Sequence, residues 1–348
     1  MKTEAAVLVE LNQPLVISDL ELPALKPGQV IVDVAFSGVC HTQLLECRGY
    51  RGPDPYLPHC LGHEGSGVVI EISSGVTKVK EGDHVILSWI KGSGANVNST
   101  TYGWAEGIVN AGAITTFNQQ AVISENRLTV ITDEVSLKTA ALLGCAVPTG
   151  LGAVFNVAKP MPGQSIVVFG TGGIGLCAVM AASLASCVPI IAVDLVADKL
   201  ENARQLGATH LVDASQSAPT DIIKQICPNG VDFAIEATGR PAVMQQSIES
   251  VRNQGGTVVV IGNARHGEML EFNPWHLNLG KKILGTWGGD SIPERDYPRY
   301  CKLTEAGKLN LTPFLNKPTY TLQDINIALE DLEAGKVARP VIKMENLD

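Results

Sequence analysis

The chain has 348 residues, 45% of them hydrophobic and 18% charged, with a formal net charge of −9. This length exceeds one ordinary core and predicts two domains, on a prior of about 150 residues each, in a globular protein. An acidic chain without a lysine- or arginine-rich run repels nucleic acid and anionic membranes, so we exclude both as partners.

The first 90 residues have the pattern of short strands separated by turns. Residues 25–29 (LKPGQ) and 79–83 (VKEGD) are typical turns between the apolar runs. Val- and Ile-rich runs occupy residues 5–10, 15–22, 29–38, 65–73 and 83–89. The pattern predicts a mostly β unit.

After about residue 147 the pattern changes to strands buried on both faces, alternating with helices. Helical patterns cover 197–207 and 241–255, each closed by a glycine suited to a helix end. Strand and helix alternation predicts a doubly wound, parallel-sheet α/β domain of the Rossmann type. Apolar runs occupy residues 165–170, 189–195, 209–213, 232–238 and 256–262.

We place this dinucleotide-binding domain at residues 148–289 and a catalytic domain at 1–147, completed by 290–348. The tail shows two helical patterns and then a strand at 339–344 that we expect to rejoin the β-rich unit. The uncharged stretch 166–193 imitates a membrane span. Glycines and Pro189 interrupt it, which favours a strand, turn, helix and second strand.

A glycine-rich turn marks the nucleotide site. Gly170, Gly172 and Gly175 form G-x-G-x-x-G directly after an apolar strand and before an Ala-rich helix. Such a turn lets a pyrophosphate approach the backbone at a helix N-terminus. The next strand ends at Asp194, about 20 residues further on, where a carboxylate binds the adenosine ribose hydroxyls and repels a 2′-phosphate. This predicts NAD rather than NADP.

Cys40, His63 and Cys145 are candidate metal ligands. Two thiolates and one imidazole leave a fourth tetrahedral position open, as in a catalytic zinc site. Spacing alone does not establish the set, because either cysteine is equally well explained as a small buried hydrophobe. None of the eight cysteines forms a close C-x-x-C pair, and the N-terminus lacks an apolar leader, so we expect a reducing, cytoplasmic location.

Several motifs together resemble the zinc-dependent alcohol dehydrogenases of the medium-chain dehydrogenase/reductase family. The resemblance covers essentially the full length and implies a GroES-like catalytic domain, a Rossmann domain, one catalytic zinc and NAD. It predicts hydride transfer between NAD and an alcohol, aldehyde or ketone. The motifs are GVCHT at 38–42, GHEGSG at 62–67, VKEGDHV at 79–85, GCAVPTG at 144–150, GTGGIG at 170–175 and GKVARPVIKM at 335–344.

The resemblance also implies residue roles. Cys40, His63 and Cys145 would bind zinc, Glu64 would be a close neighbour or transient ligand, and Thr42 would accept the alcohol proton. Further positions match as follows: His41 and Arg339 contact the coenzyme pyrophosphate, Lys199 lies beside the adenosine ribose, Gly173 belongs to the phosphate turn, Ile174 and Thr149 lie near the nicotinamide, and Trp89 is a wall of the substrate pocket.

Three departures from the family pattern stand out. Residues 90–107 contain none of the four cysteines that bind a structural zinc in many relatives, so we expect a loop and no structural zinc. Gln43 replaces the usual Asp that supports the zinc-bound His, which predicts a more electrophilic zinc. Leu45 replaces the usual proton-relay His, so protons must leave from Thr42 by another route, with Glu46 as a candidate group.

Three alternatives remain at this stage. They are a zinc-free quinone or enone reductase, a polyol dehydrogenase, which usually has Glu as third ligand, and a non-catalytic dinucleotide-binding protein. We expect a small primary aliphatic or aromatic alcohol or its aldehyde as substrate. Residues 281–289 (KKILGTWGG) resemble the family's dimer-forming strand, which predicts a homodimer or homotetramer.

Overall fold

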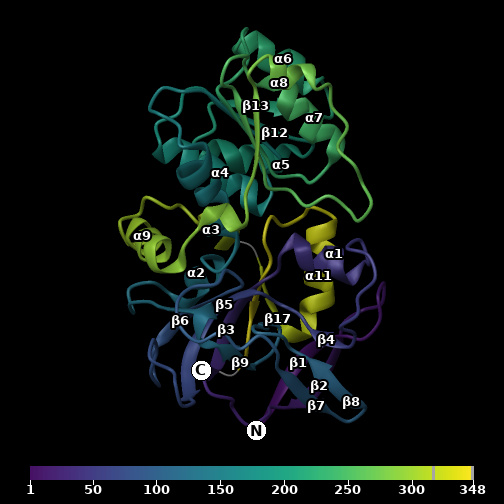
Figure 1. Cartoon of the computed structure of the whole chain (residues 1–348), viewed down its shortest axis with the longest axis vertical. Helices are drawn as coiled ribbons and strands as arrows, with labels where there is room; N and C mark the ends of the chain where they lie inside the picture. Colours follow the sequence, from purple (N-terminus) through teal and green to yellow (C-terminus); the bar gives the residue numbers. More distant parts are fainter. Residues whose placement is uncertain (316–317, 346–348) are drawn as a thin grey trace. The chain divides into compact units, whose positions relative to one another are not determined.

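The computed structural model describes residues 1–315 and 318–345. Backbone contacts divide the chain into two units, residues 1–145 with 292–348 (unit 1) and residues 146–291 (unit 2). Figure 1 labels the elements of both units. The metal-ligand candidates all belong to unit 1, and the glycine-rich turn belongs to unit 2.

Unit 1 contains a closed barrel in the order β1-β2-β7-β8-β4. Its interior is apolar because alternate residues of β1 and β2 point inward, among them Ala5, Val7 and Leu20, all fully buried. The strands are β1 Lys2–Leu8, β2 Val16–Glu21, β4 His59–Cys60, β7 Thr101–Trp104 and β8 Gly107–Asn110.

The hairpin of β7 and β8 corrects one expectation. Residues 90–107 were predicted to be a loop, and the segment from Thr101 to Trp104 is instead a strand. Tyr102 is fully buried, and its hydroxyl accepts a hydrogen bond from the Val122 N–H at 2.9 Å. The buried Tyr102 side chain gives this segment a side that packs into the core, which the Ser-, Asn- and Gly-rich composition did not indicate.

The second sheet of unit 1 has the order β10-β6-β5-β3-β18-β17, with β9 also paired to β3. Its longest strand, β3, pairs antiparallel with β5 and buries Val30, Val32 and Val34 in the core. The strands are β3 Gln29–Gly38, β5 Glu64–Ile72, β6 His84–Ser88, β9 Gln120–Ser124, β10 Leu128–Val130, β17 Thr319–Thr321 and β18 Val341–Lys343.

The C-terminal segment packs into unit 1. Strand β18 pairs antiparallel with β3, and helix α11 contacts α1, where Arg48 and Glu333 form an ion pair at 2.6 Å (Figure 1). The helices of unit 1 are α1 His41–Cys47, α2 Leu137–Leu142, α9 Pro293–Glu305, α10 Thr312–Leu315 and α11 Ile325–Glu333, with 3-10 turns at Glu125–Arg127 and Leu322–Asp324.

Unit 2 is the predicted doubly wound domain, with a wholly parallel sheet in the order β13-β12-β11-β14-β15-β16. The strand order reverses between β11 and β14, the point where such sheets bind ligands. The strands are β11 Ile166–Phe169, β12 Ile190–Asp194, β13 His210–Asp213, β14 Phe233–Glu236, β15 Thr257–Val260 and β16 Lys282–Gly285.

Helices connect these strands, and their apolar side chains complete a core around Val167, Phe169 and Ile191. The helices are α3 Ala146–Gly152, a π-helical segment Ala153–Ala158, α4 Gly173–Leu184, α5 Ala197–Gln205, α6 Pro219–Ile226, α7 Pro241–Ser250, α8 Trp275–Asn278 and a 3-10 turn Gly288–Asp290. Within residues 1–315 and 318–345, none of the helices combines the length and the apolar character that crossing a membrane requires.

Candidate active site

The pairing of β3 with β5 explains why Cys40 and His63 meet. The antiparallel register pairs Ser37 with Gly65, so the residues just after β3 lie opposite those just before β5. Cys40 follows the first strand as the N-cap of α1, and His63 precedes the second. Two ligands that are distant in sequence therefore lie at the same end of one strand pair.

Cys145 reaches the same place through strand β6. The Ser88 hydroxyl donates to the Gly144 carbonyl at 2.6 Å and lies 2.6 Å from the Tyr297 hydroxyl, which comes from helix α9. A side chain at position 144 would place its Cβ 2.3 Å from the Leu87 carbonyl oxygen, so only glycine permits this close approach. These contacts fix the backbone immediately before Cys145.

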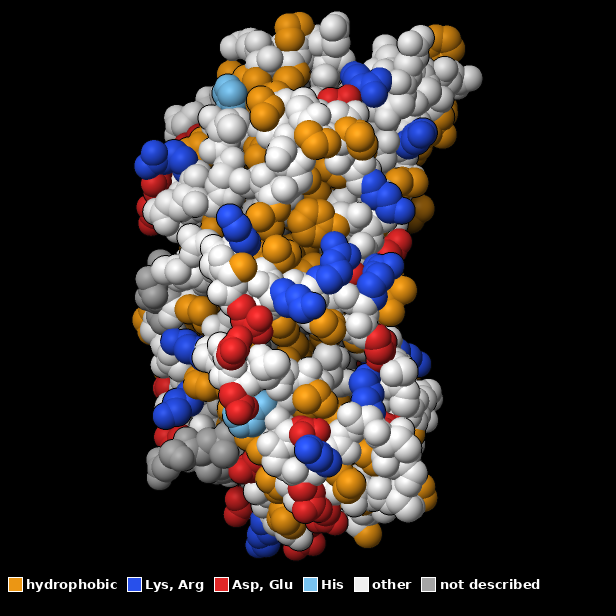
Figure 2. All heavy atoms as spheres, turned by 90° about the vertical axis from the view of Figure 1, so that its left-hand side faces the viewer, with side chains coloured by type: hydrophobic (Ala, Val, Ile, Leu, Met, Phe, Trp, Pro, Cys, Tyr) orange, Lys and Arg blue, Asp and Glu red, His pale blue; other side chains and the backbone are white. Residues whose placement is uncertain are grey.

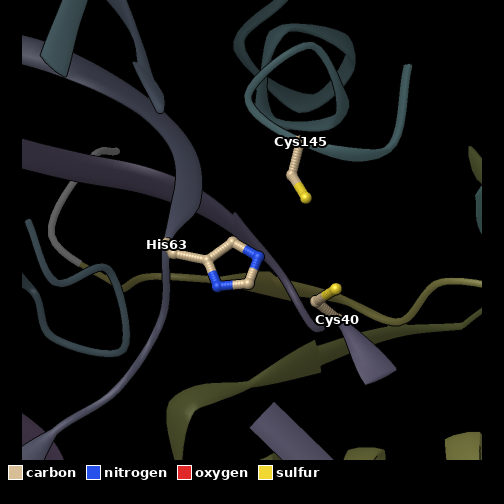
Figure 3. Close-up of side chains that lie close together, drawn as sticks. All are labelled: Cys40, His63 and Cys145. Atoms are coloured by element: carbon tan, nitrogen blue, oxygen red, sulfur yellow. The ribbon is translucent and has the colours of Figure 1, made fainter. Parts of the chain in front are cut away.

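The three side chains converge on one point (Figure 3). The two sulfurs and one ring nitrogen lie within 4.8 Å of one another. Ligand atoms around a tetrahedral zinc are separated by about 3.6–3.8 Å, given Zn–S and Zn–N lengths of about 2.3 and 2.0 Å. Small side-chain adjustments bring the atoms to these distances.

The donor set fits zinc in two further respects. His63 Nε2 is buried and has no hydrogen-bond partner among residues 1–315 and 318–345, although a buried polar atom is costly without one. A bound metal ion supplies that partner. Both cysteines are buried free thiols, and two sulfurs with one imidazole are a typical zinc donor set.

The surroundings of one of the two thiols favour the thiolate form that binds a cation. A hydrogen bond from the Cys145 thiol lowers the pKa of Cys40 well below its usual value, against the opposing effect of burial, and the Arg339 charge lowers it further. The same contact raises the pKa of Cys145. The thiolate form is the metal ligand, so a lowered thiol pKa favours binding.

Gln43 connects two of the ligands. Its Oε1 accepts the Cys40 backbone N–H at 2.8 Å, and its Nε2 makes a short contact with His63 Nδ1. The residue is 1% exposed, so these contacts are shielded from water. The amide thereby contacts the Nδ1 side of the imidazole, while Nε2 lies with the two sulfurs in the ligand cluster. The predicted effect of Gln43 on the zinc stays a prediction.

Glu64 does not belong to the three-residue ligand cluster. Its Oε1 accepts from Arg339 Nε at 2.5 Å, and the two side chains are 0% and 3% exposed. Burial lowers the pKa of the Arg339 guanidinium, but the charges of Cys40, Glu64 and Cys145 outweigh it and raise that pKa well above its usual value. The transient-ligand role of Glu64 and the pyrophosphate role of Arg339 stay predictions.

Three further candidates lie around the cluster. His41 and Thr42 begin α1, His41 exposed and Thr42 half-buried. The Trp89 ring meets the His63 ring edge-on, with centroids 6.3 Å apart, and the backbone N–H of Trp89 donates to the backbone carbonyl of His63 at 3.0 Å. Trp89 therefore borders the ligand cluster, which is compatible with its predicted place in a substrate pocket wall.

The glycine-rich turn of unit 2 lies at the end of β11, at the reversal of strand order. Gly170 has φ +85°, and a Cβ at Gly175 would come within 1.8 Å of the Gly170 carbonyl oxygen. A Cβ at Gly172 would meet no atom within 4 Å among the residues described, so the turn is open there. Gly173 and Ile174 start α4, whose N-terminus can face a phosphate.

Asp194 ends β12 as expected, but its carboxylate already has internal partners. Oδ2 accepts from the Thr171 N–H at 2.7 Å and hydroxyl at 3.0 Å. Oδ1 accepts from the N–H groups of Leu195 and Val196 at 2.8 and 3.1 Å. A carboxylate offers about four acceptor sites, so ribose hydroxyls would compete with the Thr171 hydroxyl. The ribose contact stays a prediction, and it would replace one of these internal hydrogen bonds.

Lys199 and Thr149 are the other two coenzyme candidates in unit 2. Lys199 is half-buried in α5. Thr149 is 5% exposed in α3, and its buried hydroxyl has no partner within the described chain. A nicotinamide carboxamide would supply the hydrogen-bond partner that this buried hydroxyl lacks.

Comparisons with known proteins agree with this arrangement. Residues 26–133 match the alcohol dehydrogenase GroES-like domain, and residues 173–306 match the zinc-binding dehydrogenase family. The chain is 34% identical to the S-(hydroxymethyl)glutathione dehydrogenase of Synechocystis sp. over 98% of its own length and 100% of that protein. The chain belongs to the zinc-dependent alcohol dehydrogenases of the medium-chain dehydrogenase/reductase family.

Solved structures of alcohol dehydrogenases superpose over nearly the whole chain. Benzyl alcohol dehydrogenase from Acinetobacter calcoaceticus has a TM-score of 0.88 at 30% identity, with 99% of both chains covered. An alcohol dehydrogenase zinc-binding domain protein from Burkholderia ambifaria has a TM-score of 0.87 at 31% identity, also with 99% of both chains covered. The expected fold class and family are confirmed.

Membership of this dehydrogenase family weighs against the alternatives left open by the sequence. A zinc-free reductase or non-catalytic protein has no need of three converging metal ligands, and Cys145 stands where polyol dehydrogenases usually have Glu. The face shown in Figure 2 carries both basic and acidic side chains, with several of the basic ones close to one another.

Two supporting residues were missed by sequence reasoning. Ser88 fixes the backbone before Cys145, and Thr171 holds Asp194. Ser88 ends a recognised strand, and nothing local shows that its hydroxyl faces residue 144. Thr171 carried a usable signal, because a hydroxyl inside G-x-G lies next to the end of the following strand in a βαβ unit.

Proposed function

We propose that this dehydrogenase oxidises small primary alcohols, aliphatic or aromatic, to aldehydes with NAD and catalyses the reverse reduction. The observation that carries the proposal is the convergence of Cys40, His63 and Cys145 with an unpartnered His63 Nε2. Thr42 lies two residues after the first ligand, at the start of the same helix.

The roles of the chain's own residues follow from this geometry. A zinc ion held by the two sulfurs and His63 Nε2 would supply Lewis acidity, which makes the alcohol hydroxyl more acidic. Gln43 orients the imidazole, and Thr42 accepts the hydroxyl proton. Trp89 would bound the space beside the His63 ring and exclude water from the reacting carbon.

The coenzyme preference rests on unit 2. The open turn at Gly172 and the N-terminus of α4 suit a pyrophosphate, and Thr149 offers a hydroxyl. A bound nicotinamide would accept the hydride. The Asp194 carboxylate at the end of β12 would repel a 2′-phosphate, which supports NAD over NADP.

The substrate class draws on the named relatives. They are an S-(hydroxymethyl)glutathione dehydrogenase and a benzyl alcohol dehydrogenase, so both a polar and an aromatic primary alcohol belong in the test set. An aromatic residue next to the ligand cluster favours an apolar carbon skeleton.

Assembly and location are part of the same proposal. We expect a homodimer or homotetramer formed through β16, an edge strand of its sheet, near which Trp287 is 75% and Leu284 38% exposed. All eight cysteines are free thiols, which suits a reducing compartment such as the cytoplasm.

A substrate screen tests the proposal. Zinc-loaded protein is assayed by NADH absorbance with ethanol, longer primary alcohols, benzyl alcohol, S-(hydroxymethyl)glutathione and a polyol, each with NAD and NADP and with or without chelator. We expect NAD-dependent turnover of a primary alcohol that chelation abolishes. Undiminished turnover by metal-stripped protein, or a clear preference for NADP, contradicts it.

A further inference from the structure

A polar cavity in unit 1 lies beside the helix that carries Thr42. It has a volume of about 570 Å³, and its lining includes Glu46, Arg51, Asp54, His59 and Asn110. One water molecule occupies about 30 Å³, so the cavity has room for a chain of waters. Of these residues, only Glu46 has been given a candidate role so far, in the route by which protons leave Thr42.

Helix α1 connects this cavity with the proposed proton acceptor. Thr42 and Glu46 are four residues apart, about 6 Å along the helix axis and on the same face. Both are half-buried, whereas the three residues between them are buried in the core. The Thr42 hydroxyl has no hydrogen-bond partner among residues 1–315 and 318–345. Both side chains on this face are therefore partly exposed, and Glu46 is the one that lines the cavity.

Glu46 is suited to receive a proton from that water. Burial raises the pKa of its carboxyl group, and the charges of His63, Arg51 and His59 lower it in part. Cys40 raises it slightly. These residues, together with Asp54 in the cavity wall, are the charged and titratable groups that face Glu46. A carboxyl pKa raised toward neutrality makes a better proton carrier at physiological pH.

The contacts of Glu46 leave it free to exchange a proton. One carboxylate oxygen, Oε1, accepts from Arg51 Nη1 at 2.8 Å, and the side chain is 24% exposed. Across the cavity, His59 Nε2 lies 2.8 Å from Asp54 Oδ2, and its Nδ1 lies 3.1 Å from the Cys60 carbonyl oxygen. His59 and Asp54 thus satisfy each other, and Glu46 is the carboxylate of the cavity wall that α1 carries, four residues after Thr42.

We propose that Glu46 receives the alcohol proton from Thr42 through cavity water and passes it to the solvent, in place of the absent histidine at position 45. This inference rests on the proposed function. As an alcohol loses a hydride to the coenzyme, its hydroxyl proton goes to Thr42 Oγ1, whose own proton moves through water to the Glu46 carboxylate. The protonated carboxyl then releases that proton to bulk water. The balance is alcohol plus NAD⁺ giving aldehyde, NADH and one H⁺, and the reverse path supplies the proton for aldehyde reduction.

The test compares Glu46→Gln with Glu333→Gln in the zinc-loaded enzyme. The control removes the same charge from another arginine partner at the C-terminal end of α1, because Glu333 pairs with Arg48, the C-cap of α1, and does not line the cavity. Stopped-flow mixing records NADH absorbance and proton release to an indicator dye. Removing a proton-transfer group costs about 10²-fold or more. We expect Glu46→Gln to slow proton release by this factor in weak buffer, with recovery as a small diffusible base such as imidazole is added. Zinc content should stay unchanged.

A second readout does not depend on turnover. In ¹³C NMR of the zinc-loaded enzyme without coenzyme, the one glutamate carboxyl resonance that Glu46→Gln removes should titrate above the usual value of about 4.3. A Glu46→Gln variant that matches wild type in weak buffer, or that added base does not accelerate, overturns the relay while leaving the dehydrogenase function intact. A wild-type enzyme that forms no NADH with any alcohol refutes the proposed function and the relay with it.

Discussion

Replacing Gln43 by Glu is expected to tighten zinc binding. For His63 Nε2 to bind a metal through its lone pair, the ring proton must sit on Nδ1, which then needs an acceptor. In the structure the group facing Nδ1 is the amide Nε2, a donor, while the amide oxygen accepts the Cys40 N–H at 2.8 Å. Zinc loading therefore requires the amide to reverse, which leaves the Cys40 N–H facing a donor.

A carboxylate at this position accepts from both N–H groups at once. A hydrogen bond to a charged group contributes about 1.5–3 kcal/mol, and burying the new charge at a site that is 1% exposed offsets part of this. We expect a net gain of about 1.4 kcal/mol, which is a tenfold tighter Kd for zinc. Competition with a chromophoric chelator at fixed pH measures that Kd without any turnover.

Gln29 provides a matched control. It is also 1% exposed, with Oε1 accepting the Lys26 N–H at 2.8 Å and Nε2 donating to the Thr100 hydroxyl at 2.7 Å. Gln29→Glu introduces the same charge into the same unit away from the ligands and should leave zinc affinity unchanged. An unchanged or weaker zinc Kd for Gln43→Glu would falsify the reasoning about the two N–H donors.

Three further outcomes are expected. Cys145→Ala should reduce bound zinc from near one per chain to near zero and abolish alcohol oxidation, while NADH fluorescence still reports coenzyme binding, because the turn at Gly170 is untouched. Glu294 is partly buried, which raises its pKa, but hydrogen bonds from Lys78 and Ser93 prevail and lower it from 4.5 to about 2. The stability from this lowered pKa is present above pH 4.5 and lost as pH falls toward 2. Its side chain is 39% exposed and screened, so urea unfolding at pH 7 should show Glu294→Gln less stable by about 1 kcal/mol, with no difference at pH 2. Asp194→Gly should raise the KM for NAD by about 10–100-fold, which corresponds to the loss of one or two hydrogen bonds to a charged group, and should reduce the preference for NAD over NADP. If the variant and the wild type have equal KM values for NAD, Asp194 does not bind the coenzyme.

The sequence was sufficient for the fold class and for the three candidate ligands, for different physical reasons. The periodicity of strands and helices depends on neighbouring residues in the chain. The alternating pattern over residues 165–262 therefore predicted a parallel sheet, which the structure contains. The ligand set needed the family motifs, because Cys40 and Cys145 are each indistinguishable from a buried small hydrophobe in isolation. Their convergence depends on the register of β3 with β5 and on the Ser88 contact to Gly144, which are properties of the folded chain.

The loop that replaces the cysteine-rich lobe shows where local patterns fail. Its polar composition predicted no regular structure, and buried Tyr102 with half-buried Trp104 provides the core contact that makes a strand. The preceding residues are held by a carboxylate from another segment, since Glu125 accepts from the N–H groups of Lys78 and Ala95 at 2.7 Å each. Composition cannot reveal such partners, because they lie about 30 to 50 positions away in the chain.

The placement of all three ligands within unit 1 has a consequence for how the enzyme can be dissected. Cys145 is the last residue of the first segment of that unit, and the coenzyme candidates Thr149, Gly170 and Asp194 belong to unit 2. Zinc affinity is therefore set by contacts internal to unit 1, chiefly those of Gln43 and of the Ser88 and Gly144 pair. A substitution at either place should change metal binding while leaving NADH affinity in zinc-free protein unaltered. Hydride transfer requires both units. Turnover is therefore the one measurement of the three that should fall after a substitution in either unit.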